Sequence, residues 1–236
     1  MKTITWQLEG HVATVWLNSG ENRFNNDFLQ KFLEVLDEIE ESTDARTLIV
    51  TSSHEKIFSN GIDLDWLSPY VLAGDTETAK GFFYKLNALF ARLVSYPLVT
   101  IAAISGHAFA GGAILACAFD FRLMRSDRGF FCFPEVDLNI PFLPGMIALL
   151  RSAIPRHKLD EMYYGGLRLT AKECQAHHII TKACPREELM SEALAFAGTF
   201  NKERKTIKEM KRRYNSHILH ALEVTDVPYI EEGRLN

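Results

Sequence analysis

The stretch from Thr100 to Asp120, TIAAISGHAFAGGAILACAFD, constrains the fold more than any other part of the chain. Residues 99–104 form a short apolar run rich in β-branched residues, which predicts a buried strand. Gly111 and Gly112 then open a small-residue apolar run that suits a buried helix. Two glycines at a helix start allow another group to approach backbone N–H donors that have no partner inside the helix. This predicts either a site for an oxygen that gains negative charge or close packing of a helix on a sheet, and from this stretch alone we favour packing.

The segments around this stretch alternate between strand and helix patterns. A hairpin is predicted over residues 4–8 and 12–17, followed by a helix over 25–42, a strand over 48–51 and a long helix over 76–95. Further strands are predicted over 121–124 and 130–133, and helices over 187–200 and 202–222. The alternation of strand and helix predicts an α/β fold with parallel pairing.

Composition limits the classes of function. The chain has 236 residues, which fits one large domain or one domain with a small helical extension. A net charge of −4 gives no basic footprint for nucleic acid, and no apolar run reaches membrane-spanning length. The four cysteines have no metal-type spacing, and we expect no metal site and reduced thiols. The first residues suggest no leader peptide and residues 233–236 no peroxisomal address, so we expect a cytoplasmic protein.

Basic residues gather in the predicted C-terminal helix. Seven of them lie between Lys202 and Arg213, interleaved with Glu203 and Glu209. We interpret them as a solvated helix face, and a contact with an anionic ligand or a neighbouring subunit is the alternative.

A second motif, residues 58–64 (FSNGIDL), precedes a short helical pattern. Gly61 permits an unusual backbone turn. Asp63 is predicted to cap the helix, and Pro69 is predicted to end it.

Several motifs, in order, resemble those of the crotonase superfamily, the enoyl-CoA hydratase/isomerase family. Residues 58–64 resemble its F-S-x-G-x-D-[LI] signature, and residues 106–112 resemble G-x-[AC]-x-G-G-G. Residues 170–180 resemble T-A-x-E-A-x-x-x-G-[LI]-V, with His178 where glycine is usual. The resemblance extends from the first hairpin to about Ile180.

This resemblance implies an α/β fold built as a crotonase-like ββα spiral, with a helical C-terminal trimerisation region. It places the spiral core domain in residues 1–185 and the helical region in 186–236. It also implies an acyl-CoA thioester substrate, no separate cofactor because coenzyme A is part of the substrate, and a homotrimer or hexamer.

The resemblance further implies an oxyanion hole, in which the backbone N–H groups of Ile62 and Gly111 hold the thioester oxygen as it becomes an enolate. The expected substrate-binding residues are Phe24, Gly61, Asp63, Leu64, Trp66 and Gly112. For Asp63 and Asp120 we favour a cap or a buried hydrogen-bond acceptor.

The chain departs from the family pattern at one acid. Hydratases of the family use two glutamates, and these positions fall on Ile114 and Glu135. A single carboxylate suits moving a proton better than adding water, as in the Δ3,Δ2-enoyl-CoA isomerases. Glu135 is therefore predicted to take a proton from C2 of a 3-enoyl-CoA and return it to C4, with its pKa raised by apolar neighbours.

Three alternatives stay open at this point. One is a hydratase, hydrolase or decarboxylase that uses Glu135 with Asp137, Asn139 or a bound water. Another is a non-catalytic CoA-binding or assembly protein, and a third is a simple structural role for Glu135, such as a surface salt bridge. His107 lies in the glycine motif, residues 106–112, so contact with a ligand is one interpretation, but we favour a hydrogen-bonded packing histidine.

Overall fold

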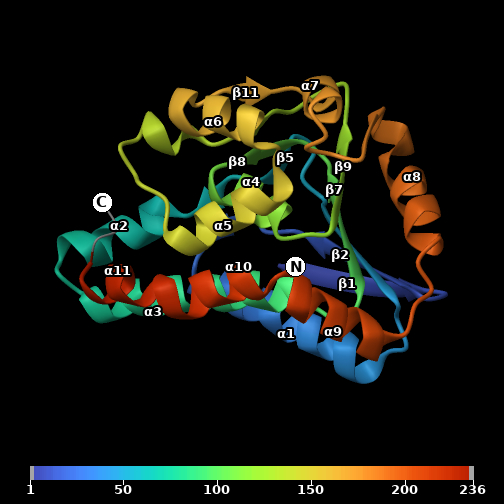
Figure 1. Cartoon of the computed structure of the whole chain (residues 1–236), viewed down its shortest axis with the longest axis horizontal. Coiled ribbons are helices and arrows are strands. Elements are labelled where there is room, and N and C mark those ends of the chain that lie inside the picture. The colour runs from blue at the N-terminus through green and yellow to red at the C-terminus, as the bar shows by residue number, and fades with distance from the viewer. Residues whose placement is uncertain (1–2, 234–236) are drawn as a thin grey trace.

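A six-stranded sheet forms the centre of the computed structural model, which describes residues 3–233 (Figure 1). Its strand order is β1-β2-β4-β7-β9-β12. The strands are β1 (Ile4–Glu9), β2 (Val12–Leu17), β4 (Thr47–Ser52), β7 (Val99–Ile104), β9 (Phe121–Arg125) and β12 (Lys182–Cys184). β1 and β2 form the predicted antiparallel hairpin, and the other neighbours pair in parallel, which confirms the α/β prediction.

A smaller sheet has the order β11-β10-β8-β5. It contains β5 (Ile57–Ser59), β8 (His107–Phe109), β10 (Phe131–Cys132) and β11 (Arg168–Leu169), and a separate pair joins β3 (Arg23–Phe24) to β6 (Gly61–Ile62). The strand predicted over 130–133 is shorter than expected. Pro134, with no N–H to donate, follows it and opens a 3₁₀ turn over Pro134–Val136.

Helices fill the connections between strands. They are α1 (Asn26–Ser42), α2 (Leu64–Leu72), α3 (Thr76–Val94), α4 (Gly111–Cys117), α5 (Pro144–Ala153), α6 (Arg156–Gly165), α7 (Ala171–Ala176), α8 (Arg186–Gly198), α9 (Arg204–Tyr214), α10 (Ser216–His220) and α11 (Val227–Glu231), with a π-helical segment over Ala221–Thr225. Within residues 3–233, no helix has the length and apolar character needed to cross a membrane.

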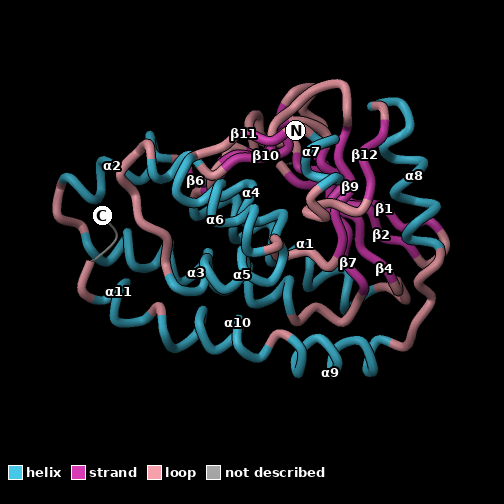
Figure 2. Tube along the Cα trace, turned by 45° about the horizontal axis from the view of Figure 1, so that its top comes forward, coloured by secondary structure: helices cyan, strands magenta, loops and turns pink. Residues whose placement is uncertain are grey.

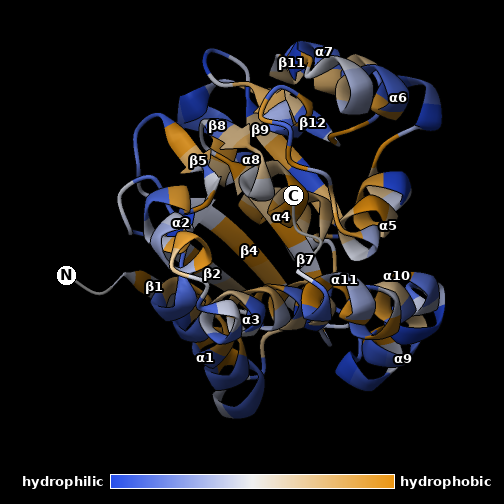
Figure 3. Ribbon diagram, turned by 90° about the vertical axis from the view of Figure 1, so that its left-hand side faces the viewer, coloured by the Kyte–Doolittle hydropathy of each residue, from blue (hydrophilic) through white to orange (hydrophobic). Residues whose placement is uncertain are grey.

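The large sheet is covered on both faces. Ile49 and Ile101 face α8 and pack with Leu189 and its neighbours, while the alternate residues of the same strands face the main core. Figure 2 shows α8 beside the strands, with α3, α4 and α5 on the other side of them. In Figure 3 the strands β4 and β7 are apolar and the outer faces of the surrounding helices are polar. Both faces are therefore buried, as parallel strands require.

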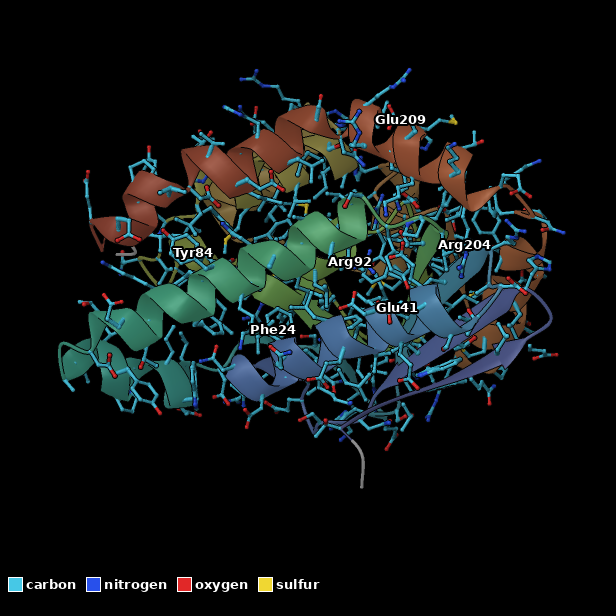
Figure 4. All side chains as sticks on the ribbon, turned by 90° about the horizontal axis from the view of Figure 1, so that it is seen from below. Phe24, Glu41, Tyr84, Arg92, Arg204 and Glu209 are labelled. Atoms are coloured by element: carbon cyan, nitrogen blue, oxygen red, sulfur yellow. The ribbon has the colours of Figure 1, made fainter. Side chains whose placement is uncertain are left out.

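The C-terminal helices pack back onto α3 and the central sheet. Asn215 donates to the Val94 carbonyl oxygen at 2.8 Å, and Asn87 donates to Asp226 at 2.8 Å. Arg204, at the start of α9, donates to the Glu40 carbonyl oxygen of α1 at 2.9 Å and to the Ala45 carbonyl oxygen beyond that helix at 2.8 Å (Figure 4). The division at residue 185 and the trimerising role of these helices remain predictions.

Three local predictions were wrong or incomplete. Pro69 does not end α2, because its carbonyl still accepts from Ala73 N at 3.0 Å and the helix continues to Leu72. The helix predicted over 202–222 breaks at Asn215. The basic residues are not all solvated, because Lys211 is buried and pairs with Asp120 at 2.8 Å.

Candidate active site

Three parallel strands of the small sheet, β5, β8 and β10, end at the same edge. The segments that follow them are residues 60–63, 110–112 and 134–136, and we call these segments the sheet edge. Ligand sites of parallel sheets lie at the carboxyl ends of the strands. The fold therefore gathers the three predicted catalytic positions, 62, 111 and 135, at one edge although they are far apart in sequence.

Two of these segments touch through their main chains. Gly61 has φ +75°, and a β-carbon on it would lie 2.4 Å from Gly111 N and 2.9 Å from Gly112 N. A β-carbon on Gly112 would lie 2.1 Å from the Ser59 carbonyl oxygen. No side chain fits at either position. The close packing that we favoured from the glycine pair is thus present, and it brings backbone donors of the two segments together.

The two predicted oxyanion donors lie next to each other. Asp63 N donates to the Phe24 carbonyl oxygen at 3.0 Å across the β3–β6 pair. Since successive strand amides point to opposite sides, the Ile62 N–H points away from β3. A β-carbon on Gly111 would lie 3.3 Å from Ile62 N, so Gly111 and the Ile62 amide are in close contact. Gly111 is the first residue of α4, and its N–H has no intrahelical acceptor.

Ala110 holds an unusual conformation directly before this helix. Its φ is 50° and its ψ is −129°, a region that residues other than glycine rarely adopt. Such a conformation costs about 1–3 kcal/mol and is retained where the surroundings enforce it. Ala110 N donates to the Cys132 carbonyl oxygen at 3.0 Å, which holds the turn against β10. Ala110 stands where the family's G-G-G pattern has its first glycine, and this departure is the sequence signal for the positive φ.

Glu135 lies in the 3₁₀ turn and is 7% exposed. Its Oε2 atom is buried and has no hydrogen-bond partner within the described residues. Burial raises the pKa of this carboxyl from 4.5 to about 7. Among the apolar neighbours of Glu135 in sequence, Phe131 and Phe133 are fully buried, whereas Phe130 and Val136 are partly exposed. Glu135 is buried and its Oε2 atom has no partner within residues 3–233, which argues against a surface salt bridge, whereas another structural role for Glu135 is not tested.

Glu135 also lines a pocket of about 370 Å³. The other lining residues are Val136, Asn139, Ile140, Pro141, Phe142, Tyr163 and Tyr164. A larger hollow of about 440 Å³ lies beside Arg122 and contains none of the residues predicted for catalysis or substrate binding. Of these two hollows, the smaller one is therefore the one that contains a residue predicted for catalysis.

Ile114 stands at the position where hydratases of the family have their second glutamate, and this position is apolar and buried. Ile114 is 2% exposed and packs in the main core. Asp137 and Asn139, the alternative polar groups, are both exposed, and Asn139 lines the pocket at Glu135. A role for Asn139 beside Glu135 therefore stays open.

The predicted substrate-binding residues have different surroundings. Phe24 is fully buried and stacks on Phe28, with ring centroids 5.5 Å apart. Its ring packs against Gly111 on the same side as Ile62 N, since a β-carbon on Gly111 would be 3.2 Å from Phe24 Cε2. Phe24 therefore packs against the glycine segment and fixes its position. Its expected place in the acyl-CoA channel stays a prediction.

The residues around α2 have mostly structural contacts. Asp63 accepts from Trp66 N at 3.3 Å and caps α2, as we favoured. Trp66 is half-buried and packs on Phe82 at 5.6 Å, and Leu64 is partly exposed. A contact of Asp63, Leu64 or Trp66 with substrate is a prediction that the structure does not test.

Sequence reasoning missed two residues that support the Gly61 turn. Ser59 Oγ donates to the Asn22 carbonyl oxygen at 2.7 Å and accepts from Gly61 N at 3.1 Å. Asn22 is fully buried with φ 51°, and its amide donates to Ser52 Oγ at 2.8 Å and to the Phe58 carbonyl oxygen at 2.9 Å. Ser59 belongs to the recognised motif, whereas the loop around Asn22 carried no signal beyond its polarity.

Two other candidates have structural roles. His107 Nδ1 accepts from Phe130 N at 3.3 Å, which supports the packing interpretation, and burial lowers the pKa of its imidazole. Asp120 Oδ2 accepts from Thr100 N at 2.8 Å, Thr100 Oγ1 at 3.0 Å and Lys211 Nζ at 2.8 Å. We call Thr100, Asp120 and Lys211 the Asp120 cluster, and it confirms the acceptor role favoured for Asp120.

No cofactor or metal ligand set was predicted. In residues 3–233, no group of three or more histidine, cysteine or acidic side chains is arranged to hold a metal ion.

Comparisons with known proteins identify the family of the chain. The family model described as enoyl-CoA hydratase/isomerase matches residues 7–227. Peroxisomal enoyl-CoA delta isomerase 2 of Arabidopsis thaliana is 31% identical over 169 residues, covering 70% of this chain and 69% of that protein. A putative enoyl-CoA hydratase of Thermus thermophilus is 30% identical over 192 residues, covering 80% of this chain and 74% of that protein.

Solved structures share the fold. Human mitochondrial delta3-delta2-enoyl-CoA isomerase superposes with a TM-score of 0.86 at 23% identity, covering 98% of this chain and 90% of that chain. A family protein from Pseudomonas syringae superposes with a TM-score of 0.87 at 25% identity, covering 97% of each chain. The fold is thus the crotonase-like spiral that the motifs implied. With the family model matching almost the whole length, the chain belongs to the enoyl-CoA hydratase/isomerase family.

Proposed function

We propose that the protein is a Δ3,Δ2-enoyl-CoA isomerase in which Glu135 is the sole acid and base. The observation that carries this proposal is the buried Glu135 carboxyl at the sheet edge, one oxygen of which has no hydrogen-bond partner in the described part of the chain. Ile114 occupies the place of a second acid and cannot orient water. The names of the Arabidopsis relative and of the human structure, both isomerases, support the same reaction.

The mechanism follows from the three segments of the sheet edge. The N–H groups of Ile62 and Gly111 bind the thioester oxygen. Glu135 removes a proton from C2, the C–H electron pair moves toward the carbonyl, and a dienolate forms on the bound oxygen. Glu135 then returns the proton to C4, and the double bond ends between C2 and C3. No atom is gained or lost, and no further reactant is needed.

The pKa of Glu135 suits both steps. A group that takes and returns the same proton works best when its pKa is near the working pH, because neither form is then greatly favoured. Burial brings the pKa to about 7, and no hydrogen bond from residues 3–233 occupies the Oε2 atom. The Asp120 carboxylate, by contrast, is held by three donors.

The same proposal includes an acyl-CoA thioester as substrate, no separate cofactor, a cytoplasmic location, and assembly into a homotrimer or hexamer. The family match supports the thioester. Assembly is supported by the family resemblance alone, and analytical ultracentrifugation of the purified chain tests it.

The test offers purified protein a 3-enoyl-CoA and, separately, a 2-enoyl-CoA. We expect isomerisation of the first and no addition of water to the second. Glu135→Gln should abolish turnover and retain acyl-CoA binding. Hydration of the 2-enoyl-CoA would contradict the proposal.

A hydratase, hydrolase or decarboxylase is the second candidate, and it is favoured by Asn139, which lines the pocket beside Glu135. It predicts that Asn139→Ala abolishes turnover of its substrate. A non-catalytic CoA-binding protein predicts binding without turnover, and no change when Glu135→Gln is made.

A further inference from the structure

A buried carboxyl group interrupts the apolar face of the C-terminal helices. Buried residues recur at every fourth position from α10 to α11, and they are Ile218, Leu222, Asp226 and Ile230. Asp226 is fully buried, and burial raises the pKa of its carboxyl. Burying a carboxyl costs stability, whereas an apolar side chain at the same place would add to the packing. The hydrogen bonds of this carboxyl must therefore compensate for its burial.

The Asp226 carboxylate caps α5 from a distant part of the chain. Its Oδ1 atom accepts from Gly145 N, in the first turn of α5, at 2.7 Å, and its Oδ2 atom accepts from the Asn87 amide at 2.8 Å. Leu143, which precedes α5, provides no side-chain cap. Backbone N–H groups at a helix start have no partner inside the helix, and the helix dipole favours a negative group there. Asp226 therefore supplies the cap that the local sequence lacks.

The main chain of α5 lies directly against the C-terminal helices at this point. A β-carbon on Gly145 would lie 2.6 Å from Asp226 Oδ2 and 2.5 Å from Leu222 Cδ2, so no side chain fits there. On another side α5 packs against α4, the helix that begins with Gly111 (Figure 1). The helix α5 is thus held between the C-terminal helices and α4.

A short, stiff link joins α5 to the turn that contains Glu135. Leu138 N and Ile140 N donate to the Glu135 carbonyl oxygen at 3.1 and 3.0 Å, so this turn extends to Ile140. Residues 141–143 connect it to α5, which begins at Pro144. The proline rings of residues 141 and 144 fix φ at both ends of the link. A change in the position of α5 is therefore passed on to the Glu135 turn.

We propose that Asp226 is a positioning residue for Glu135. Its carboxylate fixes the first turn of α5, and the link then holds the Glu135 turn in place. The catalytic consequence rests on the proposed function, in which Glu135 must face both C2 and C4 of the substrate. Displacing a catalytic group by about 1 Å lowers the rate by about 10²-fold. Loss of the bond between Asp226 and Gly145 should therefore lower kcat, although the buried Asp226 does not touch substrate.

The first experiment needs no turnover. Asp226→Ala removes the acceptor of Gly145 N, and mass spectrometry measures hydrogen exchange over residues 136–143 relative to the strand β7 in the folded variant. We expect this relative rate to rise by about tenfold or more. Asn215→Ala is the matched control, because Asn215 is also buried and docks the same helices, but its side chain bonds to Val94 of α3. The control should change the relative rate by less than about twofold.

The second experiment uses the isomerase reaction. A Glu135 carboxyl that water can reach should titrate nearer its ordinary pKa of 4.5 than the value of about 7 that burial gives it. In Asp226→Ala we expect kcat to fall by about 10-fold to 100-fold and the acid limb of kcat/KM to move down by about one pH unit or more. Asp226→Asn keeps an acceptor for Gly145 N and should recover most of the lost kcat. Asn215→Ala should keep the acid limb of the unmodified protein.

Two outcomes would overturn the positioning role. One is unchanged relative exchange over residues 136–143 in folded Asp226→Ala, and the other is an equal shift of the acid limb in Asn215→Ala, which would mean general loosening of the C-terminal helices. If Asp226→Ala does not fold, Asp226→Ser takes its place with the same expectations, because its hydroxyl ends one bond short of the Gly145 amide. Failure of the proposed function looks different, since the unmodified protein would then not isomerise a 3-enoyl-CoA while the exchange experiment still decides the positioning role.

Discussion

The sheet edge and the Asp120 cluster differ in whether their carboxyl groups have hydrogen-bond partners. In the Asp120 cluster one carboxylate oxygen accepts three hydrogen bonds, and a buried lysine supplies the countercharge. At the sheet edge the Glu135 oxygen has no partner in the described chain. The cluster stabilises the fold because its groups are satisfied. The edge can act on a ligand because its groups are not, and such groups cost stability.

The largest expected effect is on turnover. Glu135→Gln should lower kcat for a 3-enoyl-CoA by about 10⁴-fold, because one carboxyl performs both proton transfers. Asp120→Asn should leave kcat per folded molecule within about threefold, since Asp120 lies outside the sheet edge. Steady-state kinetics of both variants tests this. An equal loss of kcat in Asp120→Asn and Glu135→Gln would contradict the assignment of catalysis to the sheet edge and of stability to the Asp120 cluster.

A methyl group at the contact between the two glycine segments should have the next largest effect. Gly61→Ala places a β-carbon 2.4 Å from Gly111 N, so the two amides must separate. Loss of one oxyanion donor costs about 10²–10³ in kcat. Gly74→Ala is the control, because Gly74 has a similar φ of +71° but no atom within 4 Å. If both variants lose kcat equally, backbone strain and not the collision is responsible.

The pH dependence of stability should separate the two regions. Glu135 holds its proton up to a pKa of about 7 when folded, while the unfolded chain releases it near 4.5. Its contribution to stability is therefore present below pH 4.5 and is lost as the pH rises through about 7, by about 3 kcal/mol in total. Activity runs the other way, since the base form is needed. Urea unfolding of the unmodified protein and of Glu135→Gln at about pH 5 and pH 8 isolates this contribution, and equal pH dependence in both would contradict it.

Breaking the Asp120 cluster should lower the free energy of unfolding by an amount similar to, or slightly smaller than, the pH-dependent contribution of Glu135. Asp120→Asn leaves the Lys211 ammonium buried without its countercharge, at a cost of about 2–3 kcal/mol. Asp65→Asn removes an exposed partner of Arg23 and should change stability by less than about 0.5 kcal/mol. The midpoints of urea unfolding measure both. A small loss in Asp120→Asn would mean that solvent already screens the pair.

The smallest expected effect is a gain. Ala110→Gly relieves the positive φ next to the oxyanion segment and should stabilise the protein by about 1 kcal/mol. Ala113→Gly, inside α4, should instead destabilise it by about 1 kcal/mol or more. Thermal unfolding distinguishes the two signs, and a loss in Ala110→Gly would show that the sheet edge stores no strain there.

Much of the fold was readable from local patterns. The alternation of strand and helix predicted the parallel sheet because each element carries its own periodicity. The packing interpretation of the Gly111-Gly112 pair is confirmed, whereas the anion site that the same pair suggested stays a prediction. The pKa of Glu135 was predicted in direction because its apolar neighbours are adjacent in sequence.

What the sequence did not reveal depends on distant partners or on backbone torsions. Lys211 read as part of a solvated face, because its partner Asp120 is 91 residues away. Asn22 lies outside every strand and helix pattern of the sequence, although its side chain donates to the Phe58 carbonyl oxygen across 36 residues. The positive φ of His178, at a position where the family pattern has glycine, is likewise a torsion that no periodicity encodes.

The docking of the last helices bears on how the chain is made. Asn87 meets Asp226 across 139 residues, and Val94 meets Asn215 across 121. During translation α3 therefore leaves the ribosome long before the residues that accept from the Asn87 side-chain amide have been synthesised. The nascent chain stays partly folded until the C-terminal helices emerge. Contacts of such long sequence separation slow folding, so chaperone dependence during translation should concentrate on the exposed side of α3.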